Sequence, residues 1–293
     1  MNLQQLNKKI NAYERLMRLD KPIGILLLLW PTLWALLIAA HGKPDWIIVL
    51  IFITGTVLMR SAGCVMNDLA DHSFDGLVER TKHRPLITKE VSKKEAYWLA
   101  AGLCLAAFSL VCLMNRLTIY ISFAALFFAA TYPLTKRFLA IPQAYLGIAF
   151  GMGIPMAFAA TTGNVPTVVW PLMAANIFWA IAYDTEYAMV DRDDDLKIGI
   201  MSSAITFGRF DVLAVMLCYA ATLLLLVIAG QQLALGYGFY GGLGVAAVVA
   251  IYHYRLIKAR EKSQCFKAFL HNNWFGFAVF VGLVAHYFTH YFM

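Results

Sequence analysis

The sequence predicts an all-α fold, a polytopic membrane bundle of nine transmembrane helices with its N-terminus in the cytoplasm. Three observations lead to this prediction. The composition is unusually apolar, nine apolar segments have membrane-spanning length, and the basic residues gather in alternate connections between those segments. Together they predict that the whole chain, residues 1–293, forms a single integral membrane domain.

Composition separates this chain from soluble proteins. Of its 293 residues, 61% are hydrophobic and 14% are Asp, Glu, Lys or Arg, whereas soluble domains are about 45–50% apolar and about 25% charged. The mean hydropathy of +0.66 excludes a disordered or fibrous chain. Nine helices of about 20 residues would use roughly three-fifths of the chain, which leaves no room for a separate soluble domain.

The first 22 residues are predicted to form a short helix on the cytoplasmic membrane surface. Leu3, Leu6, Ile10, Tyr13 and Met17 recur at helical spacing, and basic side chains lie between them. This pattern is typical of interfacial helices. No small-residue cleavage site follows the first apolar segment, so we expect that segment to be an anchor and not a removed signal peptide.

Nine apolar segments follow, each long enough to cross a bilayer as a helix. Their lengths run from 17 to 21 residues, and only Asn115 and Arg116 divide the third from the fourth. Two glycine-rich stretches, Gly151-Met-Gly153 and Gly241-Gly242-Leu-Gly244, predict close helix packing and not phosphate-binding loops. The segments are Ile23–Ala40, Trp46–Val65, Tyr97–Met114, Leu117–Pro133, Ile141–Thr161, Val165–Tyr183, Val212–Gly230, Leu233–Tyr252 and Trp274–Tyr291.

The basic residues predict the orientation. Of 24 Lys and Arg residues, 21 lie in the N-terminal segment and the even-numbered connections, whereas Lys43 and Arg116 alone lie on the other side. Such asymmetry places the N-terminus and the even connections in the cytoplasm. The net charge of +7 therefore reflects orientation, and no nucleic-acid partner is expected.

The acidic residues are concentrated differently. Thirteen of 17 lie in residues 66–96 and 184–211, which we expect to be cytoplasmic active-site loops. On a helix, Asp71 and Asp75 share a face, as do Asp191 and Asp195. Like charges at this spacing repel unless a cation lies between them, and oxygen ligands in this number suit Mg²⁺ shared with a substrate phosphate. A solvated acidic loop would be a reasonable explanation for a single pair. It explains two such pairs on the same side of the membrane less well.

Basic residues accompany these acids. Arg80 and Arg84 follow the first acidic cluster, and Lys136 and Arg137 end the fourth segment. They could bind a diphosphate whose charge Mg²⁺ neutralises only in part, although orientation alone explains them equally well. Arg60 is the only charged residue inside a segment. Buried charge is costly in a membrane, so Arg60 is predicted to bind a carboxylate in a cavity, with a structural pair to an aspartate as the alternative.

These motifs resemble the UbiA superfamily of intramembrane prenyltransferases. The resemblance rests on Asn67-Asp68-x-x-Asp71-x-x-x-Asp75 and Asp191-x-x-x-Asp195, and it covers nearly the whole chain. The stretches 183–195, Lys197-Ile-Gly199 and 80–86 are most similar to the bacterial branch that prenylates 4-hydroxybenzoate in ubiquinone biosynthesis.

The resemblance implies an activity and a set of roles. The activity would be Mg²⁺-dependent transfer of a polyprenyl group from polyprenyl diphosphate to the 4-hydroxybenzoate ring carbon ortho to the hydroxyl, at the cytoplasmic side of the bacterial inner membrane. Metal would be held by four catalytic aspartates, Asp71, Asp75, Asp191 and Asp195, with Asn67 and Asp68 in support. Arg80, Arg84, Lys136 and Arg137 would contact the phosphates, and Arg60 would face the aromatic carboxylate.

Other classes of membrane protein remain as alternatives. A transporter also buries charge within a bundle, but its site usually lies near the bilayer midplane at interrupted helices, whereas these acids lie at one surface. A CDP-alcohol phosphotransferase would carry Ala-Arg in the motif that follows Asp75-Gly76, and this chain does not. A related prenyltransferase with another aromatic acceptor is the third alternative.

Overall fold

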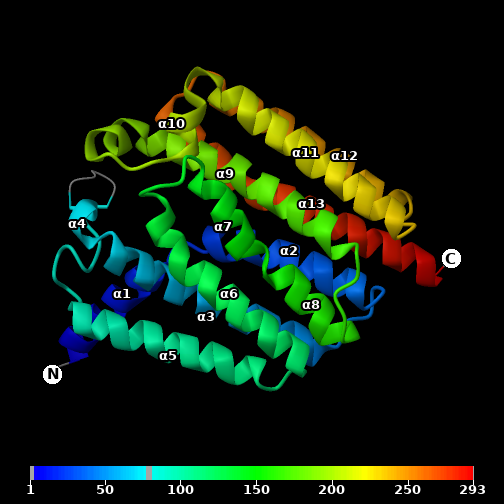
Figure 1. Ribbon diagram of the computed structural model, residues 1–293, viewed down its shortest axis with the longest axis horizontal. Helices are drawn as coiled ribbons and strands as arrows, with labels where there is room; N and C mark the ends of the chain where they lie inside the picture. Colours follow the sequence, from blue (N-terminus) through cyan, green and yellow to red (C-terminus); the bar gives the residue numbers. More distant parts are fainter. Residues whose placement is uncertain (1–2, 77–80, 293) are drawn as a thin grey trace.

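The computed structural model describes residues 3–76 and 81–292, with the backbone alone at residues 74, 75, 291 and 292. All regular structure in these residues is helical (Figure 1). In chain order the elements are α1 (Leu3–Met17), α2 (Ile23–Ala39), α3 (Trp46–Ala70), α4 (His72–Asp75), α5 (Lys93–Val111), α6 (Arg116–Thr135), α7 (Pro142–Gly151), α8 (Gly153–Thr162), α9 (Val169–Ile198), α10 (Ser203–Phe207), the 3₁₀ turn η1 (Gly208–Phe210), α11 (Asp211–Gln232), α12 (Tyr237–Ile257) and α13 (Lys262–Phe292).

Each of the nine apolar segments coincides with one long helix or a broken pair. Within the described ranges, seven helical segments are long and apolar enough to cross a membrane; α2 is a shorter apolar helix of 17 residues, and α9 is not among the seven. The narrow division between the third and fourth segments is confirmed. Asn115 caps α6, because its side-chain oxygen accepts a hydrogen bond from the Thr118 backbone N–H at 3.0 Å.

The fifth segment consists of two helices instead of one. α7 ends at Gly151 and α8 begins at Gly153. Pro155 has no N–H to bond the carbonyl one turn earlier, and its ring displaces that carbonyl, so the helix breaks. The close packing predicted here is confirmed at Gly151, where an added Cβ would lie 2.8 Å from Asn176 Nδ2 on α9.

The structure corrects the boundaries expected for the two acidic loops, 66–96 and 184–211. α3 continues to Ala70, and α9 continues to Ile198, so Asp191 and Asp195 lie on a helix and not in a loop. A helix bonds its own backbone groups and continues past the apolar stretch until a residue ends it. Gly199 does so with a left-handed φ of +72°, and its N–H bonds the Asp195 carbonyl.

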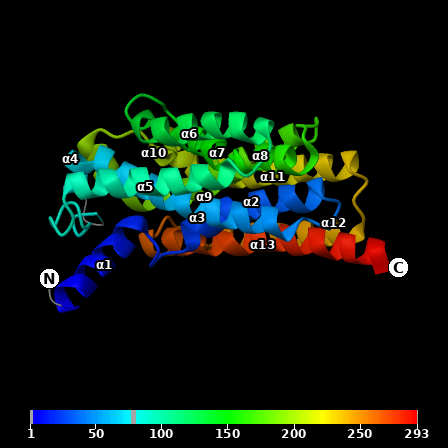
Figure 2. The ribbon, with the colours of Figure 1, turned by 90° about the horizontal axis from the view of Figure 1, so that it is seen from below.

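The helices form an elongated bundle in which α9 is largely buried (Figures 1 and 2). α9 packs against α7, α11 and α13, and stacked rings of Trp34, Trp179 and Phe275 join it to α2 and α13. α12 and α13 cross closely, because a Cβ on Gly242 would lie 2.6 Å from Gly282 Cα. The predicted packing role therefore holds for Gly242, whereas Gly241 and Gly244 face open space.

A buried polar network also ties α9 to its neighbours. The Tyr219 hydroxyl on α11 lies 3.0 Å from Glu186 Oε1, 2.8 Å from His253 Nδ1 and 2.8 Å from Asn272 Oδ1. Asn272 Nδ2 donates to Glu186 Oε2 at 2.8 Å, and the Trp179 indole donates to Asn272 Oδ1 at 2.9 Å. These groups satisfy one another within an apolar core, so the network fixes how α9 sits against α11, α12 and α13.

The predicted N-terminal helix is present as α1, which extends from one end of the bundle (Figure 2). Ala12 and Leu16 are buried against Val65, Leu86 and neighbouring apolar side chains of the segment between α4 and α5 and of α5 itself. Tyr13 and Met17 also pack partly buried against this cluster, whereas Leu3, Leu6 and Ile10 are exposed. One face of α1 is therefore docked on the bundle, and a second apolar face is left open.

Candidate active site

A cavity of about 1270 Å³ opens within the bundle. Small-molecule sites usually measure about 300–1,000 Å³, so this cavity suits a longer ligand. Its walls come from α1, α2, α3, α5, α6, α7, α8, α9 and α13 and from short connections between them. Charged and polar side chains gather around one part of it, and apolar side chains line the rest. The charged and polar set comprises Arg15, Arg18, Asp20, Lys21, Arg60, Asn67, Asp68, His83, Arg84, Lys136, Asp184 and Asn273.

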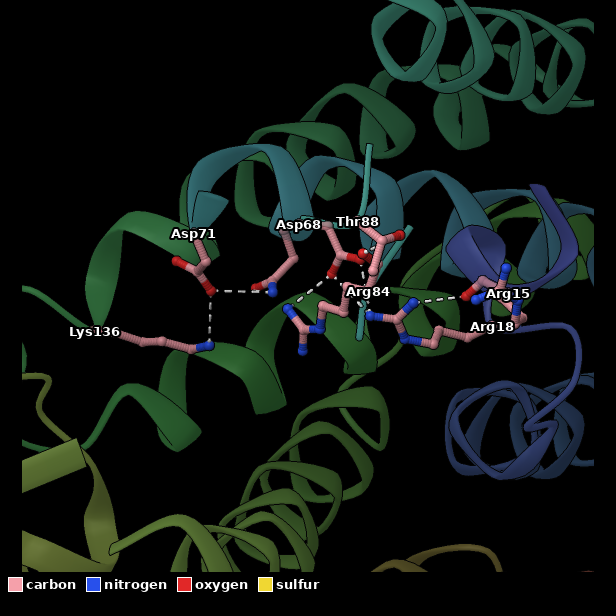
Figure 3. A network of polar contacts seen from close by, with 8 residues as sticks. Arg15, Arg18, Asp68, Asp71, Arg84, Thr88 and Lys136 are labelled. Carbon is pink, nitrogen blue, oxygen red and sulfur yellow. Dashed lines mark hydrogen bonds and ion pairs between the residues drawn. The ribbon is translucent and has the colours of Figure 1, made fainter. Parts of the chain in front are cut away.

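The first predicted acidic motif lies at the end of α3, where it meets basic side chains from elsewhere in the chain (Figure 3). Asp68 is 2% exposed and accepts from Arg18 Nη2 through both carboxylate oxygens at 2.9 Å. Arg84 Nη1 lies 2.9 Å from Asp68 Oδ1. A carboxylate this deeply buried requires such partners, because desolvation of an unpaired charge is costly.

Asp71 lies one turn further along. It accepts from Asn67 Nδ2 at 3.1 Å, and Lys136 Nζ lies 3.5 Å from the same oxygen. Arg137 donates to the Ala70 carbonyl at 3.4 Å, which satisfies a free backbone group at the end of α3. Asn67, Asp68, Asp71, Lys136 and Arg137 are thus brought together. The Asp75 side chain and Arg80 lie outside the described residues.

The second acidic motif lies on the extension of α9. Asp184 and Tyr187 line the cavity, and Asp191 lies seven residues after Asp184, on the same helical face. Asp184 interacts electrostatically with Lys136, Arg60 and Asp191, so this face of α9 is directed toward the first motif. Asp193 points elsewhere, and its carboxylate pairs with Lys262 at 2.8 Å.

A buried ion pair holds the acidic end of α9 in place. Asp211 is fully buried and accepts from Arg192 Nη1 at 3.1 Å and from Arg260 Nε at 2.9 Å. Arg192 comes directly after Asp191 in the sequence, so this pair fixes the segment that carries the second motif. Arg192 and Arg260, which in the sequence predicted only the membrane orientation, therefore also position the acidic end of α9.

The donor chemistry of the two motifs fits Mg²⁺ as two half-sites. Among the described residues, no three His, Cys, Asp or Glu side chains lie close enough together to hold an ion. Mg²⁺ keeps several waters and is usually bound by one or two carboxylates plus substrate phosphates. Asp71 on one side and Asp191 with Asp195 on the other carry carboxylates of the kind such a site requires.

Arg60 lines the cavity together with Asp184. No ion pair to an acid within 4.0 Å is present in the described part of the chain, and the buried Nε has no hydrogen-bond partner. Its guanidinium lies over the Phe150 ring, 5.6 Å from the centroid, and Gly24 of α2 makes room for it. The structural pair considered as an alternative is therefore not found, and a buried donor without a partner indicates a ligand group.

Sequence reasoning missed several residues at this site. Arg18 was counted only for orientation, yet it binds Asp68 across 50 residues of sequence. Asp184, Tyr132 and Tyr183 line the cavity, and the Tyr183 hydroxyl is buried with no partner in the described structure. The spacing of Asp184 to Asp191 was a usable signal once α9 was known to continue; nothing local marked Arg18.

Comparisons with known proteins agree with this description. The model of the UbiA prenyltransferase family matches residues 28–281. Two curated relatives, from Methylobacillus flagellatus and Dechloromonas aromatica, are named 4-hydroxybenzoate octaprenyltransferase. Each is 64% identical to this chain over 285 residues, which cover 97% of this chain and 96% of the relative.

Solved structures share the fold. The apo structure of a UbiA homolog from Aeropyrum pernix K1 matches with a TM-score of 0.79 and 24% identity, covering 89% of this chain and 96% of that one. A UbiA homolog from Archaeoglobus fulgidus bound to GPP and Mg²⁺ matches with a TM-score of 0.69 and 18% identity, covering 92% and 99%. At these identities the similarity demonstrates a common helical fold.

Proposed function

Because the chain belongs to the UbiA prenyltransferase family, we propose that it transfers a polyprenyl group to 4-hydroxybenzoate. The relatives at 64% identity carry that activity in their name, with an octaprenyl donor. The observation that carries the proposal is Arg60, a buried guanidinium with an unpartnered Nε inside a mainly apolar cavity. An aromatic acid supplies both the carboxylate that Arg60 lacks and a ring that the apolar walls accept.

The side chains divide the work of the reaction. When bound, Mg²⁺ would supply charge neutralisation for the diphosphate, held by Asp71 and Asp75 on one side and by Asp191 and Asp195 on the other. Asn67 and Asp68 support the first pair. The remaining charge on the departing diphosphate is stabilised by basic side chains, namely Arg80, Arg84, Lys136 and Arg137.

The rest of the cavity serves the organic substrates. As the C–O bond of the donor ionises, an allylic cation forms, and apolar walls exclude the water that would capture it. Arg60 holds the carboxylate of the acceptor and so orients its ring. The ring carbon ortho to the hydroxyl then attacks the cation, and the proton on that carbon is lost.

We also infer how the protein sits in the membrane. The nine apolar segments would each cross the bacterial inner membrane, with the N-terminus and the acidic motifs on the cytoplasmic side. The whole chain would then form one integral membrane domain. The exposed apolar face of α1 would rest on the cytoplasmic lipid surface, and the polyprenyl donor would enter from lipid.

A matched pair of variants on α9 tests this proposal. Asp191→Asn removes a proposed metal ligand, whereas Asp193→Asn removes an exposed carboxylate that pairs with Lys262. In detergent with Mg²⁺, 4-hydroxybenzoate and octaprenyl diphosphate, Asp191→Asn should reduce turnover by at least about 100-fold, because an electrostatic contribution of this kind is worth roughly 3 kcal/mol or more. Asp193→Asn should stay within about twofold. Full turnover by Asp191→Asn would contradict the metal assignment.

A further inference from the structure

Asp68 has an excess of positive partners. Arg18 contacts both of its carboxylate oxygens, and Arg84 contacts one of them, each at 2.9 Å. Both guanidiniums line the cavity and are partly buried, with 21% and 14% of their side chains exposed. One buried negative charge therefore holds two fixed positive charges at the edge of the diphosphate region (Figure 3).

Arg18 is also held by contacts other than the one with Asp68. Its Nη1 donates to the Arg15 carbonyl at 2.6 Å, and its backbone has a left-handed φ of +59°, which is costly for a residue with a side chain. Arg15 forms an ion pair with Glu90, and Lys9 Nζ lies 2.7 Å from Glu95 Oε1. Thr88 and Arg15 donate hydrogen bonds that lower the pKa of Glu90 below its usual value. The Arg18 guanidinium is thus held by Asp68 and the Arg15 carbonyl, whereas Lys9 contributes only to the docking of α1.

Arg84 is attached differently. It lies in the turn between α4 and α5, and its backbone carbonyl accepts from Thr88. It is also one of the residues proposed to contact the diphosphate. Arg84 contacts Asp68 through Nη1, so Asp68 and a phosphate would compete for its positive charge. A buried carboxylate left without a cation beside a diphosphate would be strongly unfavourable.

We propose that Arg18 is a positioning residue that keeps Asp68 neutralised and thereby frees Arg84 to bind the diphosphate of the donor. The proposal rests on the prenyltransferase function above and adds a residue to it. Arg18 acts through Asp68 and does not touch the substrate. Its Nη2 contacts both oxygens of Asp68, so Arg18 keeps the carboxylate paired when the charge of Arg84 is directed at the diphosphate.

A double-mutant cycle tests this mechanism. Arg18→Gln should raise the KM for octaprenyl diphosphate roughly tenfold or more, because Arg84 then stays on Asp68. The KM for 4-hydroxybenzoate should be unchanged. When Asp68→Asn has already removed the charge, adding Arg18→Gln should change the KM for the donor by less than about threefold. An equal factor in both backgrounds would mean that Arg18 acts on the diphosphate directly, and no change in either would mean that it has no role.

Lys9→Gln is the matched control. It removes a contact that docks α1 on Glu95 and leaves Asp68 untouched, so the donor KM should stay within about twofold. If Lys9→Gln raised that KM as much as Arg18→Gln, loosening of α1 would be the cause and the proposal would be overturned. Thermal unfolding in detergent reports whether each variant is folded.

The remaining outcomes are also decisive. Should Arg18→Gln fail to fold, Arg18→Lys keeps the charge but loses the guanidinium that reaches both Asp68 and the Arg15 carbonyl. Its donor KM should lie between wild type and roughly tenfold higher. A donor KM for folded Arg18→Lys that rises much more than tenfold would contradict neutralisation of Asp68 by the charge at residue 18. An inactive wild-type protein would refute the proposed function, whereas an active wild type with additive effects would refute the role of Arg18 alone.

Discussion

Gly24→Ala perturbs Arg60 without removing its charge. Gly24 on α2 faces the guanidinium on α3, and an added Cβ would lie 2.6 Å from both Nε and Nη2 of Arg60. Ordinary contact between heavy atoms needs about 3.5–4.0 Å, so the guanidinium must move by roughly 1 Å. Arg60 is long and lies beside the cavity, so it can turn away. The helix itself gains from Ala by about 0.5–1 kcal/mol, and the protein should remain folded.

The expected effect is on the aromatic acid alone. A hydrogen bond to a charged group is worth about 1.5–3 kcal/mol, which corresponds to about 10- to 150-fold in affinity when it is lost entirely. A displaced guanidinium weakens its contacts without abolishing them. We therefore expect the KM for 4-hydroxybenzoate to rise by roughly tenfold, near the lower end. The KM for octaprenyl diphosphate should not change.

Steady-state kinetics with each substrate varied in turn measure this difference. Gly102→Ala on α5 is the control, because an added Cβ there meets nothing within 4 Å and Gly102 does not line the cavity. Both variants should unfold at or slightly above the wild-type temperature. An unchanged KM for 4-hydroxybenzoate, or an equal rise for both substrates, would refute the assignment of Arg60 to the aromatic carboxylate.

Three other predictions concern the α12–α13 crossing, the buried polar network and the metal. Gly242→Ala should destabilise the α12–α13 crossing by about 1–3 kcal/mol through overpacking, whereas Gly241→Ala, which faces open space, should be neutral or stabilising in detergent melts. Tyr219→Phe should lower the melting temperature, since Glu186 loses a buried hydrogen bond worth about 1–3 kcal/mol; an unchanged melt would show that the network does not stabilise α9. Chelation of divalent ions should abolish turnover and added Mg²⁺ should restore it, and full activity in excess chelator would exclude metal dependence.

The fold was largely predictable because the membrane restricts what an apolar segment can do. A chain that cannot leave backbone groups unbonded in lipid forms helices wherever the segment is long enough. Even the short division before Asn115 was predictable, since an Asn cap satisfies the first amides of the next helix, although α5 ends earlier than expected, at Val111. The break at Gly151 was not identified, although Pro155 follows closely enough to cause it.

The ends of helices were the least predictable part of the fold. Hydropathy marks where a segment becomes polar, and that point lies at Tyr183 for α9. The helix itself continues to Ile198, because its end depends on Gly199 and on the ion pair of Arg192 with Asp211. Spacing in the sequence thus predicts the shared face of the acids, while the structure shows that α9 itself extends far enough to carry them.

The site was predictable residue by residue only where a motif is local. Asn67, Asp68 and Asp71 lie within one helical turn, so their proximity follows from spacing. Arg18 reaches Asp68 from a helix 50 residues earlier, and no periodicity encodes such a contact. Arg60 was identified for a physical reason, the cost of its charge inside an apolar segment. It lines the cavity, and among the described residues its buried Nε has no hydrogen-bond partner.

The most direct test of the central claim is the product itself. Purified protein in detergent or vesicles would be incubated with Mg²⁺, 4-hydroxybenzoate and prenyl diphosphates of different lengths, and the products analysed by mass spectrometry and by NMR of the aromatic ring. We predict one product in which a polyprenyl group replaces the ring hydrogen ortho to the hydroxyl, with the octaprenyl donor among those used. Failure to form a ring-substituted product from any of these donors would contradict the account.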